Sequence, residues 1–402
     1  MPLKVVEVMI AKVLFVALLA YTHAANQRKL TAHLNPFCDD KEVCGLCYVT
    51  AEGSNDTLHY FWSVLGAPAA LGIQTPPDSK LIDISWESLR GHNLNETSFV
   101  FSGPVLSSSA VVISQLLEYN DPENKAHLNT TEKNSTHYID QSKLLWKEIQ
   151  GCTGNGSSLV TATFVAHATT SAHDEGFFSS NGTIQFTLEV QDSDGHDIQF
   201  PHLFYTSDSS QIQLSLLNLS PQLGKTSQFA FELTVLDDSS HNRSYGISTT
   251  RTFDDEYTPG VFTSVALFDE NENSSSTFYL HWKPVCYRDP GRTVTLSVDA
   301  AYQNLTSAAS WWSFNVATAW LAHRAPKVAS SAVMVAFGSE GDGWYQENNY
   351  ATWAMSSGFG ERPLEHVSVT VLSVTSVGLG IPAIIALGTV IYVSIHKPEP
   401  KL

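Results

Sequence analysis

In the segment Ile184-Gln-Phe-Thr-Leu-Glu-Val190, large apolar side chains alternate with polar ones. Successive side chains of an extended strand point to opposite faces of a sheet, so this period of two predicts a strand with one buried face. The same alternation recurs twice more along the chain, at Phe229, Phe231, Leu233 and Val235 and at Ile212, Leu214 and Leu216. The sequence therefore predicts half-buried antiparallel strands.

Short apolar or aromatic runs on either side of this region extend the prediction. Further strands are expected at Leu58–Leu65, Leu159–Ala166, Val294–Val298 and Val333–Phe337. Helical stretches are few in this region, and Ser142–Gln150 is the best candidate, because its apolar residues recur at helical spacing. The predicted class is all-β.

The length of the chain favours two domains rather than one. Many short strands separated by turn residues are typical of β-sandwiches, so we expect two sandwich-like domains, at residues 25–220 and 221–365. The boundary is predicted at Ser220-Pro221, and the stretch Asp237–Tyr245 is an alternative.

Both ends of the chain carry membrane-targeting patterns. Lys4 and Lys12 precede an apolar run that ends near small residues, so residues 1–24 are predicted to be a cleaved signal peptide. Residues 366–395 are predicted to form a transmembrane helix, because Val367–Ile395 contains no Asp, Glu, Lys or Arg and exceeds the roughly 20 residues that a bilayer core requires. Basic residues follow this span, which predicts a type I orientation with residues 396–402 in the cytosol.

The predicted membrane helix carries two smaller features. Ser376, Gly380 and Ala383 fall on one helical face and would permit close approach of a second membrane helix, from another protein or from a second copy in a homodimer. Tyr392-Val-Ser-Ile395 matches a tyrosine-based sorting motif, but it lies at the membrane boundary.

The region between these ends is predicted to be heavily glycosylated. An exported chain meets the glycosyl transferase, and each acceptor must be exposed on the surface. Ten Asn-x-Ser/Thr sequons are present, at Asn55, Asn95, Asn129, Asn134, Asn155, Asn181, Asn218, Asn242, Asn273 and Asn304.

Disulfide bonds are expected because an exported chain folds in an oxidising compartment. The candidates are Cys38, Cys44, Cys47, Cys152 and Cys286. Two bridges among five cysteines allow fifteen patterns, which the sequence leaves open. The three clustered cysteines favour a local staple over redox or zinc chemistry, because no thioredoxin-like unit follows Cys44-Gly-Leu-Cys47.

The charge balance is strongly acidic. From Ala25 onward, 20 Lys and Arg stand against 39 Asp and Glu, a net charge of −19. Such a surface repels nucleic acid and anionic lipid headgroups, so neither is an expected partner. The same part of the chain holds 14 of the 15 histidines, and their protonation would reduce self-repulsion in an acidic compartment. We therefore hypothesise that the protein tolerates acid.

Patterns for catalysis are weak, and no cofactor or metal is expected. The best acidic cluster is Asp254-Asp-Glu256, for which a solvated turn is the commoner explanation and paired-carboxylate hydrolysis the alternative. His167, His173, Asp174 and Glu175 could gather a metal, although a polar loop is the commoner explanation. A third cluster is rich in tryptophan and could stack on sugar, but a core role is favoured; its members are Trp311, Trp312, Trp320, Trp344 and Trp353.

Several short segments resemble one known family in their amino-acid sequence and in their order along the chain. They are Asn55–Gly66, Ser114–Tyr119, Ser180–Thr183, Asp254–Phe262, Trp282–Val285 and Trp344–Met355. Together these strings resemble the glycosylated lysosomal membrane protein family across roughly Asn55 to Arg362 and the anchor. The string Asp-Asp-Glu-Tyr-x-Pro-x-Val-Phe within Asp254–Phe262 is the most specific.

The resemblance implies a lysosomal type I protein with its glycosylated part in the lumen. It further implies a non-enzymatic accessory subunit that shields a major-facilitator transporter of small peptides from proteolysis. The resemblance also implies a tyrosine-based sorting signal on a longer cytosolic tail. This chain departs from that pattern, because its matching motif lies at the membrane boundary. Delivery through the signal of a partner is therefore expected. A lumenal hydrolase or a glycan-binding receptor remains the alternative function.

Overall fold

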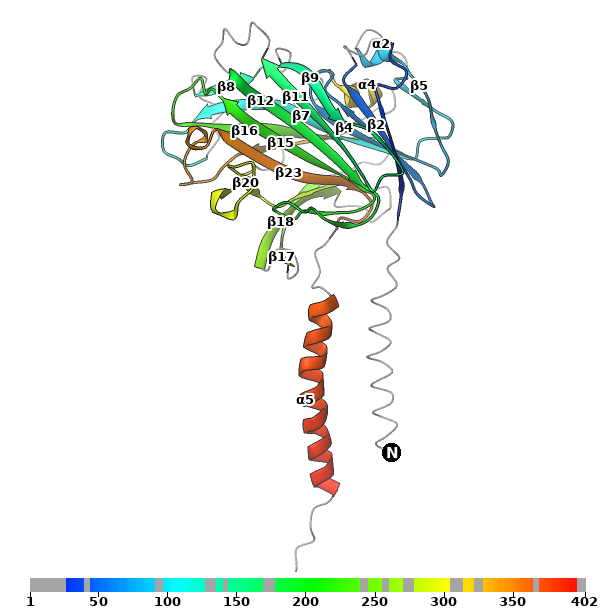
Figure 1. The fold of residues 1–402 in the computed structure, drawn as a ribbon, viewed down its shortest axis with the longest axis vertical. Coiled ribbons are helices and arrows are strands. Elements are labelled where there is room, and N and C mark those ends of the chain that lie inside the picture. Colours follow the sequence, from blue (N-terminus) through cyan, green and yellow to red (C-terminus); the bar gives the residue numbers. More distant parts are fainter. Residues whose placement is uncertain are drawn as a thin grey trace, which may run out of the picture. The chain divides into compact units, whose positions relative to one another are not determined.

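The computed structural model describes residues 27–39, 44–90, 97–126, 135–139, 144–168, 178–238, 245–254, 260–269, 278–303, 314–321, 328–363 and 369–395. The chain falls into two compact units. Residues 26–250 and 263–363 form the first unit, and residues 1–25, 251–262 and 364–402 form the second. Within the described ranges, two large antiparallel sheets account for most of the first unit (Figure 1).

The first large sheet has nine strands in the part of the chain that the structure describes. Their order across the sheet is β10 (Gly154–Asn155), β1 (Lys29–Leu34), β2 (Leu46–Glu52), β3 (Thr57–Ser63), β4 (Ala69–Thr75), β7 (Ser107–Asn120), β16 (Ser227–Asp237) and β22 (Ala329–Ala336), with β8 (Thr136–Ile139) paired to β7.

The second large sheet has ten strands within the same described ranges. Their order is β17 (Tyr245–Asp254), β18 (Gly260–Asp269), β19 (Phe278–Trp282), β23 (Tyr350–Phe359), β15 (Ser209–Leu219), β12 (Phe178–Gln191), β11 (Leu159–Ala168) and β9 (Leu144–Gly151), with β20 (Val285–Tyr287) and β21 (Ser297–Asp299) at one side.

Short elements complete the fold. Two small hairpins pair β5 (Leu81–Ile84) with β6 (Phe99–Phe101) and β13 (Gly195–His196) with β14 (Phe204–Tyr205). The helical elements are α2 (Trp86–Leu89), η2 (Val294–Leu296), α4 (Val316–Leu321), η3 (Tyr345–Glu347) and α5 (Val369–Ile395).

The two large sheets face each other across one apolar core, and this arrangement explains the alternation in the sequence. In β12 the residues Ile184, Phe186, Leu188 and Val190 are all at most 2% exposed, whereas the residues between them are half-buried. The ring of Phe231 in the first sheet lies 5.1 Å from the ring of Trp353 in the second. The fold is thus a β-sandwich, and the predicted all-β class is confirmed.

The outer face of the first sheet is also covered, which explains why every residue of β3 is buried. Phe61 of β3 stacks on Phe99 of β6 at 3.9 Å between ring centroids, and Trp320 of α4 lies 5.6 Å from Phe99. A second apolar core therefore fills the space between this face and the β5–β6 hairpin, α2 and α4. A tight turn at Gly66 supports the same region, because its φ is +75° and an added Cβ would lie 1.9 Å from the Phe314 carbonyl oxygen.

The predicted division into two sandwiches at Ser220-Pro221 is wrong. β16 follows this point in the sequence, yet it lies in the first sheet beside β7 in eleven residue pairs. β23 lies in the second sheet beside β15, which precedes the boundary. Strands from both halves therefore share both sheets and one core, so the boundary would cut through hydrogen-bonded ladders.

Two local predictions also differ from the structure. The expected helix Ser142–Gln150 lies largely on strand β9, because the backbone there pairs with β11 in the second sheet. Tertiary pairing thus overrides a weak helical spacing. The expected strand Val294–Val298 is a short 3-10 turn, η2, followed by the first residues of β21.

Candidate functional site

The described acceptor asparagines lie at the surface of the sandwich. Asn55 follows β2, Asn155 lies in β10, Asn181 lies in β12 and Asn218 lies near the end of β15. All four are exposed, which is the condition that a glycan acceptor must meet. The acceptors at Asn95, Asn129, Asn134, Asn242, Asn273 and Asn304 lie outside the described residues. Glycosylation of the ten positions remains a prediction.

The cysteines form one local bridge and one long-range bridge. Cys38 bonds to Cys44, six residues later, and Cys47 bonds to Cys152 across 105 residues. The second bridge joins the start of β2 to the segment between β9 and β10, and both of its cysteines are buried. Cys286 is a free thiol, fully buried, and burial raises its pKa to about 12. It therefore stays protonated and unreactive.

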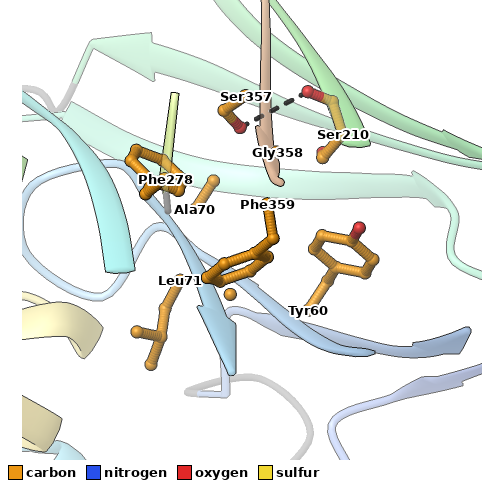
Figure 2. Close-up of a pocket in the computed structure, with 9 residues that line it drawn as sticks. Tyr60, Ala70, Leu71, Ser210, Phe278, Ser357, Gly358 and Phe359 are labelled. Atoms are coloured by element: carbon orange, nitrogen blue, oxygen red, sulfur yellow. Dashed lines mark hydrogen bonds between the residues drawn. The ribbon is translucent and has the colours of Figure 1, made fainter. Parts of the chain in front are cut away.

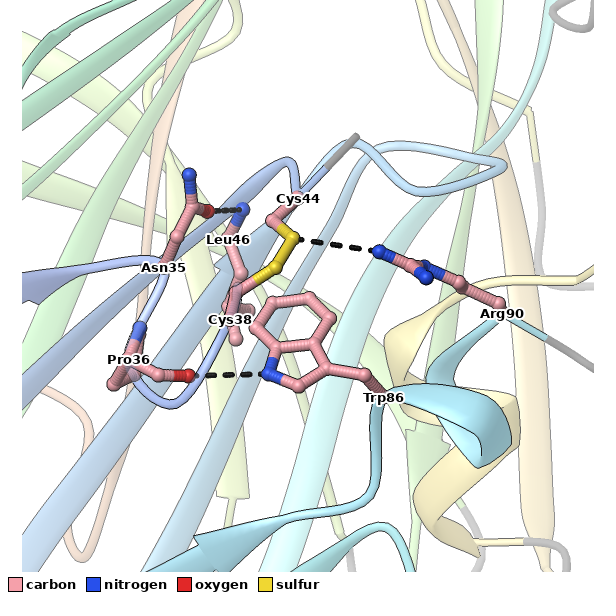
Figure 3. The surroundings of a disulfide bond; sticks show 7 residues. All are labelled: Asn35, Pro36, Cys38, Cys44, Leu46, Trp86 and Arg90. Atoms are coloured by element: carbon pink, nitrogen blue, oxygen red, sulfur yellow. Dashed lines mark hydrogen bonds between the residues drawn. A yellow bond between two sulfur atoms is a disulfide. The ribbon is translucent and has the colours of Figure 1, made fainter. Parts of the chain in front are cut away.

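The local bridge lies in a hydrogen-bonded loop (Figure 3). Trp86 Nε1 donates to the Pro36 carbonyl oxygen at 3.2 Å, and Arg90 lies 3.6 Å from the Cys44 sulfur. These contacts tie the loop after β1 to α2 and its C-terminal residue. The arrangement is that of a structural staple, in agreement with the interpretation of the clustered cysteines.

A buried ion cluster fastens the two sheets together near the start of the described chain. Arg28 is only 7% exposed. Its Nη2 lies 2.7 Å from Asp56 Oδ1, in the turn between β2 and β3, and its Nε lies 2.6 Å from Asp208 Oδ1, just before β15. Gln74 Nε2 donates to the other Asp56 oxygen at 2.6 Å. We call Arg28, Asp56 and Asp208 the Arg28 clasp. The sequence gives no signal for it, since the three charged residues are far apart along the chain.

Two histidines are buried in the sandwich and resist protonation. Burial lowers the pKa of His59 to about 4, and its ring nitrogens lie 2.8 Å from Tyr48 Oη and 3.0 Å from Thr75 Oγ1. Burial, together with the positive charges of Lys283 and Arg362, lowers the pKa of His281 to about 3. Both groups must gain a proton when the protein unfolds in acid, so they oppose the hypothesised acid tolerance.

Of the residues weighed for catalysis, only Asp254 and His167 lie in the described part of the chain. Asp254 ends β17, whereas Asp255 and Glu256 lie outside the described residues. His167 lies on β11, and its expected partners His173, Asp174 and Glu175 also lie outside them. Within the described ranges, no group of three or more His, Cys, Asp or Glu side chains could hold a metal ion.

Two of the three described tryptophans of this cluster lie in the core, as the sequence favoured. Trp320 and Trp353 are 1% and 2% exposed. Trp344 is half-buried, and its Nε1 donates to the Asp121 carbonyl oxygen at 2.8 Å. Trp311 and Trp312 lie outside the described residues.

The second unit contains the long apolar helix α5. Its segment Ser373–Ile395 has a mean hydropathy of 2.0, and none of its apolar window is buried within the described chain. By length and composition it could cross a membrane, in agreement with the predicted span. Ser376, Gly380 and Ala383 lie on this helix, and an added Cβ at Gly380 would meet nothing within 4 Å. Tyr392 and Ile395 lie in its last turns, and residues 396–402 are outside the described chain.

These features define the class of protein. A disulfide-bonded β-sandwich with exposed sugar acceptors, joined to one long apolar helix, is the architecture of a single-pass membrane glycoprotein.

Comparison with known families gives the family. The model of the family described as glycosylated lysosomal membrane protein matches residues 45–399. The chain therefore belongs to the glycosylated lysosomal membrane protein family, and it is a membrane protein of lysosomes.

Named relatives match along nearly the whole chain. Glycosylated lysosomal membrane protein B of Xenopus laevis is 27% identical over 395 residues, which cover 96% of this chain and 95% of the relative. The protein of Mus musculus is 28% identical over 348 residues, covering 85% and 82%. The protein of Homo sapiens is 25% identical over 357 residues, covering 88% and 84%. These names describe a membrane protein and not an enzyme.

Proposed function

We propose that this protein is a non-enzymatic accessory subunit that stabilises a lysosomal major-facilitator transporter of small peptides and shields it from proteolysis. The observation that carries the proposal is that one chain combines a disulfide-bonded, sugar-accepting sandwich with an apolar helix whose hydrophobic window is not buried by any described residue. The role of the protein is then to hold a protease-resistant mass beside a membrane partner.

The sandwich has the properties that resistance to proteases requires. Proteases cut segments that open locally, and opening is rare where the backbone is paired in sheets and crosslinked. Both large sheets enclose one continuous core, and a disulfide closes a loop of 105 residues between distant elements. Sugars at Asn55, Asn155, Asn181 and Asn218 would add bulk at exposed positions on several strands and turns.

The apolar helix supplies a means of association. Lipid tails are as apolar as the helix, so membrane helices associate through close packing of small residues and not through hydrophobic burial. Ser376, Gly380 and Ala383 offer such a face, either to the transporter or to a second copy of this chain. We assign the face to the transporter, with the homodimer as the competing outcome.

The experiment compares the lifetime of the transporter in lysosomes with and without this protein. Deletion should shorten the transporter's half-life, and inhibitors of lysosomal proteases should restore it. Re-expression of the full chain should rescue the half-life, whereas a chain with α5 replaced by an unrelated apolar helix should not. The proposal is wrong if deletion leaves the transporter's half-life unchanged.

Sugar shielding has a matched control at the four described acceptors. Substituting Asn55, Asn155, Asn181 and Asn218 by Gln removes the glycans and should lose the rescue. Thr57→Ser, Ser157→Thr, Thr183→Ser and Ser220→Thr exchange the hydroxyl residue of each sequon and keep it usable, so they should retain the rescue. Equal rescue by both sets would exclude shielding by these glycans.

The same cells separate the alternatives. A lumenal hydrolase would lose turnover of its substrate on Asp255→Asn and Glu256→Gln, while transporter levels stayed normal. A glycan-binding receptor would bind a soluble sugar through the full chain without the transporter. Delivery through the partner's signal predicts that this protein fails to reach lysosomes in cells that lack the transporter, and normal arrival there would contradict that route.

A further inference from the structure

Two buried hydroxyl groups, one from each large sheet of the sandwich, lack a protein partner in the described chain. Tyr60 lies in β3 of the first sheet and is 3% exposed, and Ser210 lies in β15 of the second sheet and is 1% exposed. Among the residues that the structure describes, Tyr60 Oη and Ser210 Oγ are buried and have no hydrogen-bond partner. A buried hydroxyl left in this state costs about as much as a lost hydrogen bond, so a partner is expected where the structure leaves room for one beside the hydroxyl.

Both hydroxyl-bearing residues line the same small cavity between the two sheets (Figure 2). Its volume is about 10 Å³. Residues of β4 form one wall, and Phe278, Ser357 and Phe359 of the second sheet form the other. Ser357 Oγ donates to the Ser210 carbonyl oxygen at 3.4 Å, which leaves the Ser357 oxygen able to accept a further hydrogen bond.

The size of the cavity follows from the packing of one aromatic ring. Phe359 packs directly against Gly72 of β4, where an added Cβ would come within 2.8 Å of the ring. The absent side chain at Gly72 therefore lets the ring sit between the sheets beside Tyr60. The remaining space is too small for an organic ligand, since one water molecule needs about 10 to 15 Å³ of such volume.

We propose that this cavity is a binding site for a single internal water molecule that joins the two sheets. The water accepts a hydrogen bond from Tyr60 Oη, donates one to Ser210 Oγ and donates a second to Ser357 Oγ. Two to four polar partners are what buried waters in proteins typically have. Tyr60 and Ser210 lie on β3 and β15, and the carboxylates of the Arg28 clasp, Asp56 and Asp208, immediately precede these two strands.

Two other buried hydroxyls serve as matched controls because they lack this cavity. Tyr119 Oη is buried without a hydrogen-bond partner in the described chain, at 2% exposure, and so is Ser356 Oγ, at 0%. Neither residue lines the cavity. Tyr119→Phe and Ser356→Ala remove the same chemical groups as Tyr60→Phe and Ser210→Ala, but they displace no water from this site.

The experiment measures the folding equilibrium constant of the full chain in detergent for the wild type, the four single variants and the Tyr60→Phe/Ser210→Ala double variant. With a bound water, each cavity variant should lower the constant by about tenfold, which corresponds to one lost hydrogen bond. The double variant should lower it by little more than either single variant, because the first change already releases the water. The control variants should leave the constant unchanged or raise it.

A cavity without water predicts a different outcome. If the cavity is empty, Tyr60→Phe and Ser210→Ala remove unpaired hydroxyls and should behave like their controls, with additive effects. Effects like those of the controls, or additive effects in the double variant, would each overturn the proposal. A crystal structure that resolves ordered waters gives a direct check, since it should show one water about 2.7 to 3.2 Å from both Tyr60 Oη and Ser210 Oγ. An empty cavity in such a map would also refute the proposal.

Discussion

The long-range disulfide should stabilise the sandwich far more than the local one. The perturbation is the removal of each bridge by double substitution, Cys47→Ala/Cys152→Ala or Cys38→Ala/Cys44→Ala, in a Cys286→Ala background that prevents thiol exchange. The two bridges span 105 and 6 residues. If a bridge acts by reducing the entropy of the unfolded chain, its contribution grows with the logarithm of the loop length.

The magnitudes follow from those loop lengths. A loop of roughly 100 residues corresponds to about 4.7 kcal/mol at 25 °C, and a loop of six residues corresponds to about 2 kcal/mol. Loss of the long-range bridge should therefore cost about 2.5 kcal/mol more than loss of the local bridge. Burial of Cys47 and Cys152 acts in the same direction, because their truncation also removes sulfur atoms from the core.

The assay is urea unfolding of the full chain in detergent, followed by the fluorescence of its buried tryptophans. Each variant is compared with the Cys286→Ala background, and the free energy of unfolding is obtained by linear extrapolation. Peptide mapping under non-reducing conditions verifies which bridges are present. Equal costs for the two bridges, or a larger cost for the local one, would refute the account based on chain entropy.

Other predictions test the buried charges, the acid response and a turn. Arg28→Met should lower the free energy of unfolding by about 1 to 3 kcal/mol in the same assay, because the partly buried carboxylates of Asp56 and Asp208 lose their cation; a loss under 1 kcal/mol would contradict the clasp. His281 has a folded pKa of about 3 against an ordinary value near 6.5, so only the unfolded chain gains its proton as the pH falls. Stability from this group is present above pH 6.5 and should fall by about 2 kcal/mol between pH 7.5 and pH 5, whereas His281→Gln should flatten that slope in melting curves. Gly66→Ala should lower the melting temperature by several degrees, since the new methyl group meets a backbone carbonyl across the turn; an unchanged value would refute this reading.

The sequence and the structure predict opposite contributions to the stability of the fold in acid. The composition predicts that protonation of many surface groups relieves the repulsion of a net charge of −19. The structure adds two buried histidines, His59 and His281, that destabilise the fold in acid. The melting temperature between pH 7 and pH 5 reports the balance of the two, and His281→Gln isolates the contribution of one buried group.

Local features of the fold could be predicted from the amino-acid sequence. Alternation along Ile184–Val190 and the runs around Phe229 and Ile212 specified strands, because side-chain direction in a strand depends only on neighbouring residues. The apolar span before Ile395 specified a membrane-crossing helix, because hydropathy and length suffice for that purpose. The sequons are also a local property, since each is three residues long.

Only the tertiary structure decided how these pieces are assembled. β16 pairs with β7 and β23 pairs with β15, so one sandwich replaces the two that the sequence suggested. The same long-range pairing made β9 a strand, selected the Cys47–Cys152 bridge from fifteen patterns and brought Arg28 to Asp208. The physical reason is that these contacts join residues far apart in the chain, and their free energy comes from shared burial and hydrogen-bonded ladders that no local pattern records.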